Sequence, residues 1–343
     1  MRRALAILAA AAPLLTAVPA QAAADKSPDT VKPAPAPARQ TLPTRDLPSP
    51  YTPNFSGGAR PPPSPQTPDF AYGAYQRGQY ATAFREATKR IEADRKDASA
   101  MTLLGELYNQ GLGIKQDPVR AAEWYKLAAA EGEPNAMASL GLMALDGRGM
   151  PKDRKAGEKW LEQAAAKGQP TAAYNLALLL LSGGSDADLA KAATYYRKAA
   201  DGEIGAAQHD LGVLYLKGRG VPKDPALAAQ WFRRAADNGD LAGEVEFAIL
   251  LFNGTGLPKD EARAARYFLH AASRGNAIAQ NRVARLYAIG RGVPKNLVEA
   301  AAWNLSAAAQ GLSDAWLDQT LGGLGTEERA RAERLANDRI NVR

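Results

Sequence analysis

The chain has 343 residues, of which 46% are hydrophobic and only 7% aromatic, with a formal net charge of +7 and no cysteine. The lack of cysteine excludes disulfides, thiolate metal sites and lipid attachment through a cysteine. The positive charge is spread along the chain without a run of five or more basic residues, which argues against nucleic-acid binding. Because alanine and leucine dominate the apolar residues, the composition favours an all-α fold.

The first 22 residues have the layout of a cleavable secretory signal. Arg2 and Arg3 precede an apolar run from Ala4 to Val18, and small residues follow at Ala20 and Ala22. The apolar run is shorter than the roughly 20 residues that a membrane-spanning helix needs. We therefore expect residues 1–22 to be a signal peptide, and the mature protein to be periplasmic or secreted without an integral membrane segment.

Residues 23–68 differ in texture from the rest of the chain. They hold 13 prolines and few large apolar side chains. Such a segment buries too little apolar surface to offset the entropy of ordering, so we expect a disordered, extended linker. It is interpreted as a spacer, and a proline-motif ligand is the alternative. From residue 69 the chain becomes rich in alanine, leucine and tyrosine, and residues 69–97 predict two leading helices.

Six repeats follow the leading helices. The residues that close a recurrent glycine-rich loop are separated by 36, 35, 36, 36 and 36 positions, and a large aromatic residue comes seven positions after each. The loop-closing residues are Asp117, Asp153, Asp188, Asp224, Asp260 and Asn296. The aromatic residues are Trp124, Trp160, Tyr195, Trp231, Tyr267 and Trp303. A fixed period of this length predicts a solenoid.

Each repeat predicts a helix A before the loop and a helix B after it. The Asp or Asn is expected to cap helix B, and flanking alanine pairs indicate that the aromatic ring is buried between helices. Helix A carries a small residue six positions before the loop, and glycine at this register indicates close packing. The string "LLSGGSDAD" replaces the usual loop in the third repeat, which predicts a local change of loop path or of curvature and a helix B one residue shorter.

The loop string "GRGVPKD" at residues 218–224 is rich in glycine but has neither glycine pattern of a phosphate-binding loop. We interpret it as a turn. Its glycines end helix A, Pro222 stops the helix from continuing, and Asp224 starts helix B. No nucleotide or other cofactor is therefore expected at these loops.

The string "AAQHDLGVLYLKGRGVPKDPALAAQWFRRAADNGD" at residues 206–240 resembles a repeat of the Sel-one-like (Sel1) family, a branch of the tetratricopeptide superfamily. The resemblance covers residues 98–312, in repeats at 98–133, 134–169, 170–203, 204–240, 241–276 and 277–312. Residues 69–97 are closer to an ordinary tetratricopeptide unit, and residues 313–343 are expected to form a C-terminal cap. The resemblance implies a right-handed α-solenoid of antiparallel helix pairs, with helix A on the concave side, that acts as a protein-binding adaptor.

The sequence offers little material for catalysis. The two histidines, His209 and His270, lie in different repeats, and His209 and Asp210 should point about 100° apart on a helix. The "SDADLA" string near Asp186 lacks the glycine and the final glutamate of a calcium loop. We therefore predict a protein that is not an enzyme and has no catalytic, metal or cofactor site. A hydrolase, the other class considered, would need a nucleophile with a positioned base.

The candidate partner-binding surface is the part of helix A that packing does not use. In repeats three to six, this surface consists of the residues two positions before, one position after and five positions after the small residue of helix A. They are Asn175, Leu178, Ser182, Asp210, Val213, Lys217, Glu246, Ile249, Asn253, Arg282, Arg285 and Ile289. Their identities vary while the scaffold residues repeat, as expected where a protein or peptide partner is recognised. An ordinary solvated face is the alternative.

A second functional hypothesis is a module that binds glycan or cell-wall material. It would use aromatic side chains on the surface, for which Tyr174, Tyr215 and Tyr287 are the candidates. The hypothesis depends on these rings being exposed, because stacking on a sugar requires an accessible ring face.

Overall fold

The computed structural model describes residues 69–341. This part of the chain holds sixteen α-helices and no strand. The helices are α1 (Phe70–Gln76), α2 (Tyr80–Ala93), α3 (Ala98–Gln110), α4 (Pro118–Ala130), α5 (Pro134–Asp146), α6 (Arg154–Ala166), α7 (Pro170–Leu181), α8 (Asp186–Asp201), α9 (Gly205–Lys217), α10 (Pro225–Asp237), α11 (Leu241–Asn253), α12 (Glu261–Ser273), α13 (Ala277–Ile289), α14 (Leu297–Ala308), α15 (Ala315–Leu321) and α16 (Thr326–Asn341). The expected signal and proline-rich linker lie outside the described residues.

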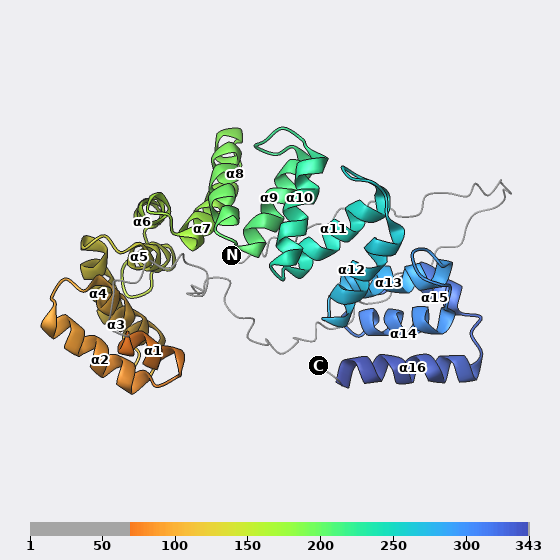
Figure 1. Cartoon of the computed structure of the whole chain (residues 1–343), viewed down its shortest axis with the longest axis horizontal. Helices are drawn as coiled ribbons and strands as arrows, with labels where there is room; N and C mark the ends of the chain where they lie inside the picture. The colour runs from red at the N-terminus through yellow and green to blue at the C-terminus, as the bar shows by residue number, and fades with distance from the viewer. Residues whose placement is uncertain (1–68, 342–343) are drawn as a thin grey trace, which may run out of the picture. The chain divides into compact units, whose positions relative to one another are not determined.

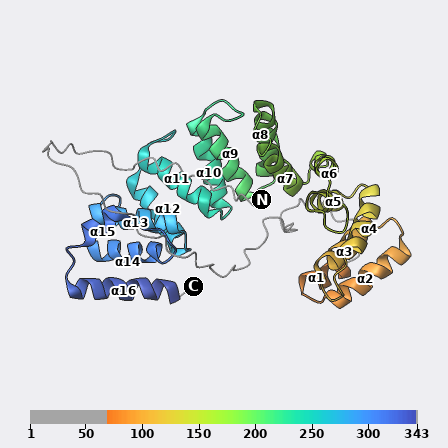
Figure 2. The same cartoon turned by 180° about the vertical axis from the view of Figure 1, so that it is seen from behind.

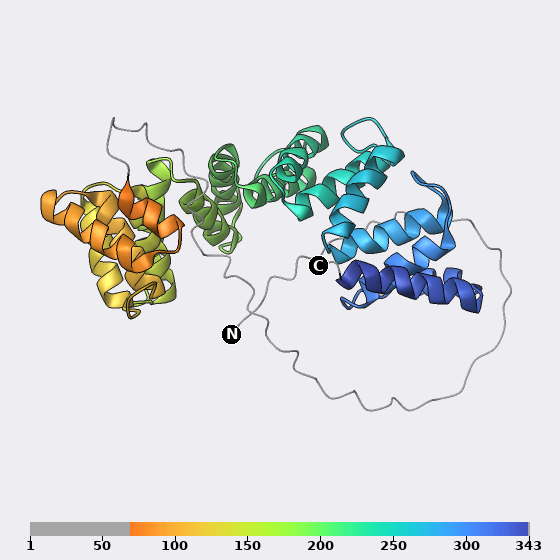
Figure 3. The ribbon, with the colours of Figure 1, turned by 60° about the horizontal axis from the view of Figure 1, so that its bottom comes forward.

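Each helix from α1 to α14 packs against the next along the chain, and α16 packs on α14. Figures 1, 2 and 3 show this succession of helix pairs from three directions. The helix A and helix B pairs are α3 with α4, α5 with α6, α7 with α8, α9 with α10, α11 with α12, and α13 with α14. The all-α repeat fold predicted from composition and period is confirmed. Within residues 69–341, no helix is both long and apolar enough to cross a membrane.

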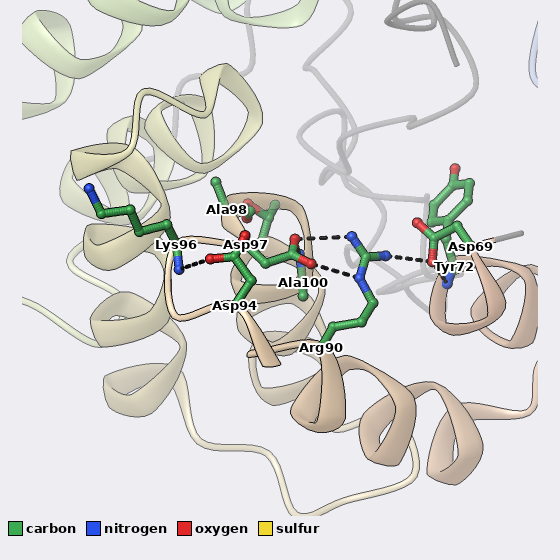
Figure 4. Close-up of polar contacts among 9 residues, drawn as sticks. Asp69, Tyr72, Arg90, Asp94, Lys96, Asp97, Ala98 and Ala100 are labelled. Atoms are coloured by element: carbon green, nitrogen blue, oxygen red, sulfur yellow. Dashed lines mark hydrogen bonds and ion pairs between the residues drawn. The ribbon is translucent and has the colours of Figure 1, made fainter. Parts of the chain in front are cut away.

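Arg90 of α2 holds the N-termini of two neighbouring helices (Figure 4). Its Nε and Nη2 donate to the Asp97 carboxylate at 2.7 and 3.0 Å, and its Nη1 lies 2.7 Å from Asp69. Both carboxylates also cap helices, since Asp69 accepts from the Tyr72 N–H and Asp97 from the Ala100 N–H. One guanidinium therefore connects α1 and α3 to α2.

Helix B begins at the loop-closing residue in five repeats. The side-chain oxygens that accept a hydrogen bond from the backbone N–H three residues later belong to Asp117, Asp153, Asp224, Asp260 and Asn296. Pro118 and Pro225 take the first helical position, where no N–H donor is needed. These caps satisfy donors that the start of a helix leaves without partners.

The third repeat starts its helix B differently, so the prediction that Asp188 is the cap is wrong. The Ser185 hydroxyl accepts from the Asp188 N–H at 3.1 Å and donates to the Asp188 carboxylate at 2.6 Å. Glycines at 183 and 184 replace the usual proline loop, so Ser185 is reached earlier and forms the cap. The predicted shortening is also wrong, because α8 has 16 residues and α4 has 13.

The side chain that fills the space between helices is the residue after each marker aromatic. These residues are 1% exposed or less in five repeats, namely Tyr125, Leu161, Tyr196, Phe232 and Phe268. Of the marker rings, only Trp231 and Trp303 are buried. Those that are partly buried are Trp124, Trp160, Tyr195 and Tyr267. The prediction of a buried marker ring is therefore confirmed at Trp231 and Trp303, whereas in the other four repeats the more deeply buried side chain is the next one along the helix, about 100° away.

Glycines in helix A make room for these buried side chains. A Cβ on Gly105 would lie 2.6 Å from a Tyr125 ring carbon, and a Cβ on Gly212 would lie 2.8 Å from the Phe232 ring. Carbon atoms do not approach this closely without displacement. Helices A and B therefore pack closely at a cost of about 1 kcal/mol in helix propensity for each glycine.

The second glycine of the recurrent loop contacts the preceding repeat. Gly220 and Gly256 have φ of +68° and +76°, and a Cβ on them would lie 2.4 Å from the Leu189 oxygen and 2.3 Å from the Pro225 oxygen. Both carbonyls belong to the first turn of the previous helix B. The loop is therefore a contact between repeats as well as a turn within one.

We expect Gly256→Ala to destabilise the fold more than Gly239→Ala. Both positions have a positive φ, +76° and +80°, so both substitutions carry a backbone strain of about 1–2 kcal/mol. A Cβ at Gly239 meets nothing within 4 Å, whereas one at Gly256 meets the backbone of α10. This overlap adds about 1–3 kcal/mol. Thermal unfolding followed by far-ultraviolet circular dichroism compares the two variants, and an equal loss of stability would contradict the inter-repeat contact.

Candidate binding surface on helix A

The twelve predicted residues on α7, α9, α11 and α13 are termed the helix A face. Three of them are exposed, namely Ser182, Lys217 and Asn253. Those that are partly buried are Leu178, Asp210, Val213, Glu246, Ile249, Arg282, Arg285 and Ile289. The Glu246 carboxylate interacts electrostatically with His209 and Lys217 of α9 and with Arg282 of α13. Side chains from three successive A helices therefore come close together on this face.

Asn175 does not belong to the accessible part of the helix A face. Its residue is 4% exposed, and its Nδ2 donates to the Thr171 carbonyl oxygen at 2.8 Å within α7. Its Oδ1 is buried without a hydrogen-bond partner among the described residues. The prediction that Asn175 binds a partner is therefore corrected, because this side chain is buried and hydrogen-bonded within its own helix.

Arg285 is occupied by the C-terminal cap. Its Nε and Nη2 donate to the Asp314 carboxylate at 2.6 and 2.9 Å, and its guanidinium lies 5.1 Å from the centre of the Trp316 ring. Asn281 donates to the same carboxylate at 2.7 Å. Arg285 was predicted to bind a partner, but it attaches α15 to α13. The sequence reasoning missed Asp314, although its position before an apolar helix start is typical of an N-cap.

His209 and Asp210 lie close together, contrary to the prediction from their adjacency on a helix. The Nδ1 of His209 is 3.0 Å from an Asp210 carboxylate oxygen, and the Tyr174 hydroxyl donates to the other oxygen at 3.3 Å. Burial alone would lower the pKa of His209, but the hydrogen bond and charge of Asp210 raise it above its usual value. Side-chain torsions bring the two groups together despite their different helical directions.

Glu246 and Arg282 have no hydrogen bond or ion pair among the described residues. Burial raises the pKa of the Glu246 carboxyl, and the nearby charges of His209, Lys217 and Arg282 offset this only in part. Burial also lowers the pKa of Arg282, with the charge of Arg285 acting in the same direction. The helix A face therefore contains an acidic and a basic group that are partly desolvated and carry no direct partner.

His270 contacts a buried acid that the sequence reasoning missed. Its Nδ1 lies 2.7 Å from the carboxylate of Glu244, whose side chain is 6% exposed. Glu244 occupies the register that holds Gln208 and Gln280 in the adjacent repeats, 36 positions away on either side. There the glutamine Nε2 donates to the Ala200 or Ala272 carbonyl oxygen of the preceding helix B. The sequence pattern that could have revealed Glu244 is a polar residue that recurs every 36 positions, at Gln208, Glu244 and Gln280.

A shallow hollow of about 340 Å³ lies beside the contact of His270 with Glu244, on the side of helix B. Its other lining residues are Ala236, Asp237, Arg263, Arg266 and Tyr267. Within the described residues, no three His, Asp or Glu side chains gather as a group that could hold a metal ion. The hollow has both acidic and basic side chains in its lining.

The aromatic residues proposed for glycan stacking are not on an open surface. Tyr215 is 8% exposed, and its hydroxyl accepts a hydrogen bond from Arg197. Tyr174 and Tyr287 are partly buried, and the Tyr174 ring packs edge-on against Tyr196. The expectation that all three rings are exposed is wrong for Tyr215, which is buried, while Tyr174 and Tyr287 are only partly exposed.

The Sel1 repeat profile matches residues 98–133, 134–169, 170–203, 205–240, 244–276 and 277–312. The chain belongs to the Sel1 repeat family. Among solved structures, a Sel1 repeat protein from Oxalobacter formigenes is 29% identical, with a TM-score of 0.59, over 70% of this chain and 97% of that chain. A protective antigen with an SLR fold from uropathogenic Escherichia coli is 26% identical, with a TM-score of 0.47, over 79% of this chain and 67% of its own. A comparison with curated proteins finds no match.

Membership of the Sel1 repeat family sets the general role of the chain. Sel1 repeat proteins generally mediate interactions between proteins, and their tetratricopeptide-like fold is typically a scaffold without catalytic activity. The family does not supply a catalytic residue to look for.

We expect Asp314→Asn to destabilise the C-terminal helices by about 2 kcal/mol at pH 7, because it removes a charge-assisted pair with Arg285. Burial would raise the pKa of Asp314, but hydrogen bonds from Arg285 and Asn281 hold it below its usual value. A carboxyl with a lowered pKa stabilises the fold above its unfolded pKa and loses this effect as the pH falls through its folded pKa.

Urea unfolding of the wild-type chain and the Asp314→Asn variant at pH 7 and in acid measures this effect. The difference between the two proteins should shrink as the pH falls towards the folded pKa of Asp314. Asp237→Asn is the control, since Asp237 forms an exposed pair with Arg233 at 3.8 Å and should change stability little. A difference that does not depend on pH would contradict the ion pair between Asp314 and Arg285.

Proposed function

We propose that this chain is an exported, non-enzymatic scaffold that binds a protein or peptide partner on the helix A face. Its role would be that of an adaptor or regulator of an envelope, signalling or polysaccharide-related complex. The location is proposed to be periplasmic or secreted, on the basis of the signal-like layout of residues 1–22.

The observation that carries this proposal is variation at fixed register. The position two residues before the small residue holds Asp210 in α9, Glu246 in α11 and Arg282 in α13, all of them partly exposed. The packing positions of helix B, by contrast, keep the same kind of residue in successive repeats: pairs of buried alanines and one buried ring. A surface whose chemistry changes on a constant frame is suited to recognition of a specific partner.

The apolar members of the helix A face support the same function. Val213 and Ile249 lie three residues after Asp210 and Glu246, which places them about one helical turn away on the same side. Both are partly exposed. Interfaces combine apolar contacts with a few charged groups that select the partner. The helix A face has both components.

We expect the double charge reversal Asp210→Lys and Glu246→Lys to weaken partner binding by roughly tenfold or more. The introduced lysines would repel the basic groups of a partner that the two acidic side chains attract. The wild-type chain should retain a partner from an envelope fraction of the source cells, and quantitative pull-down measures the loss. Glu123→Lys with Glu162→Lys is the matched control, because it makes the same charge change at exposed positions of helix B.

Circular dichroism must show that both double variants keep the helical content of the wild-type chain. Retention that is equal in the two double variants would reject the helix A face as the binding surface. A wild-type chain that retains no partner at all would contradict the scaffold function itself.

A further inference from the structure

Two charged side chains on the helix A face, Arg282 and Glu246, lack direct partners within residues 69–341. Arg282 has an Nε that is shielded from solvent and makes no hydrogen bond among the described residues. Glu246 is likewise partly buried and makes no hydrogen bond or ion pair there. Burying a charge without a partner is costly, so buried charges in proteins are normally paired. Two such groups on neighbouring helices indicate a ligand that completes them.

The neighbouring charged residues do not supply a direct partner for Glu246 or Arg282. Asp314 holds Arg285, and His209 and Tyr174 hold Asp210. Lys217 acts on Glu246 only through its charge, and its side chain is exposed at the end of α9. Burial outweighs the attraction between Glu246 and Arg282 in the pKa of both groups. The two charges are near enough to influence each other but too far apart to form an ion pair.

The order of these charges along the array is defined. Glu246 lies on α11 and Arg282 on α13, at the same register of consecutive repeats. Ile249 follows Glu246 by three residues on the same side of α11 and is partly exposed. A ligand that spans the two helices therefore meets an acidic group, an apolar contact and a basic group.

We propose that the helix A face binds an extended polypeptide segment that places a basic side chain on Glu246 and an acidic side chain on Arg282. The inference rests on the proposed function and adds to it the charge order of the partner. Charge-assisted hydrogen bonds are strong where water is partly excluded. A carboxylate matches the planar guanidinium of Arg282, and a lysine or arginine supplies the donors that Glu246 lacks.

The test is selection of twelve-residue peptides from a random displayed library by the immobilised full-length chain. The wild-type chain should enrich peptides with a basic and an acidic residue separated by a constant spacing. The exchange variant Glu246→Arg with Arg282→Glu should bind these peptides roughly tenfold more weakly or worse. It should instead enrich peptides in which the acidic and basic residues have changed places.

Two further variants keep the test decisive if the exchange variant does not fold. Glu246→Gln should lose the preference for the basic residue alone, and Arg282→Gln the preference for the acidic residue alone. Arg233→Asp with Asp237→Arg is the matched control, because it exchanges an exposed pair on helix B. This control should select the same peptides as the wild-type chain.

The outcomes separate the inference from the function on which it rests. Enriched peptides without a charge order, or with an order that the Glu246 and Arg282 variants leave unchanged, would overturn the inference and leave the scaffold function in place. A wild-type chain that enriches no peptide, and retains no protein from an envelope fraction, would overturn both.

Discussion

The close contact between each loop and the helix before it is the constraint on which the array depends. Gly220 and Gly256 bring the loop backbone against the first turn of the preceding helix B, where no side chain would fit. Gly105 and Gly212 leave room between helices A and B of one repeat for the Tyr125 and Phe232 rings. Because an added Cβ would overlap its neighbour at each of these glycines, the contacts set the spacing of the helices within narrow limits. Regular stacking follows from them.

A frame fixed in this way leaves only part of each helix free to change. Helix B is committed on its inner side to alanine pairs and one large buried side chain, such as Phe232. Helix A needs a small residue at the position that packs against this buried side chain. The remaining positions of helix A differ in charge and size from repeat to repeat. Among them, Glu246 and Arg282 form no ion pair within residues 69–341. Variation from repeat to repeat is therefore concentrated at positions of helix A outside this packing.

The end of the array shows how the same surface can be used within the molecule. Asp314 begins α15 and accepts from Arg285 of α13 at 2.6 Å, while Trp316 lies beside the same guanidinium. Arg285 lies at the position of helix A that holds Val213 and Ile249 in the two preceding repeats. An acidic group presented to an arginine of helix A is thus a contact that this chain already makes. It offers an internal example of the recognition proposed at Arg282.

The repeat period and the helix caps could be predicted from the sequence because they depend on local chemistry. Asp224 caps α10 through a hydrogen bond three residues away, which spacing alone reveals. The prediction of the cap was wrong at Asp188, because Ser185 lies three residues earlier and caps α8. The repeat period alone does not distinguish Trp124 from Tyr125 as the buried ring, because a period of 36 residues fits two adjacent positions equally well.

The accessible surface could be predicted only in part, because burial depends on what the neighbouring repeat supplies. The register that leaves Asp210 and Glu246 partly exposed buries Asn175, and the register that leaves Val213 partly exposed places Arg285 against the C-terminal cap. The contact between His209 and Asp210 depends on side-chain torsions that helical direction does not specify. The position of Arg285 depends on a contact with Asp314, which is distant in sequence, whereas the contact between His209 and Asp210 joins adjacent residues.

The central claim is that partners bind the helix A face, and crosslinking in living cells tests it most directly. A photoreactive residue placed at Val213 or Ile249 should capture one defined protein. The same residue at Arg233, which is 58% exposed on helix B, should capture none above background. Capture of the same protein from Arg233 but not from Val213 or Ile249 would contradict the account.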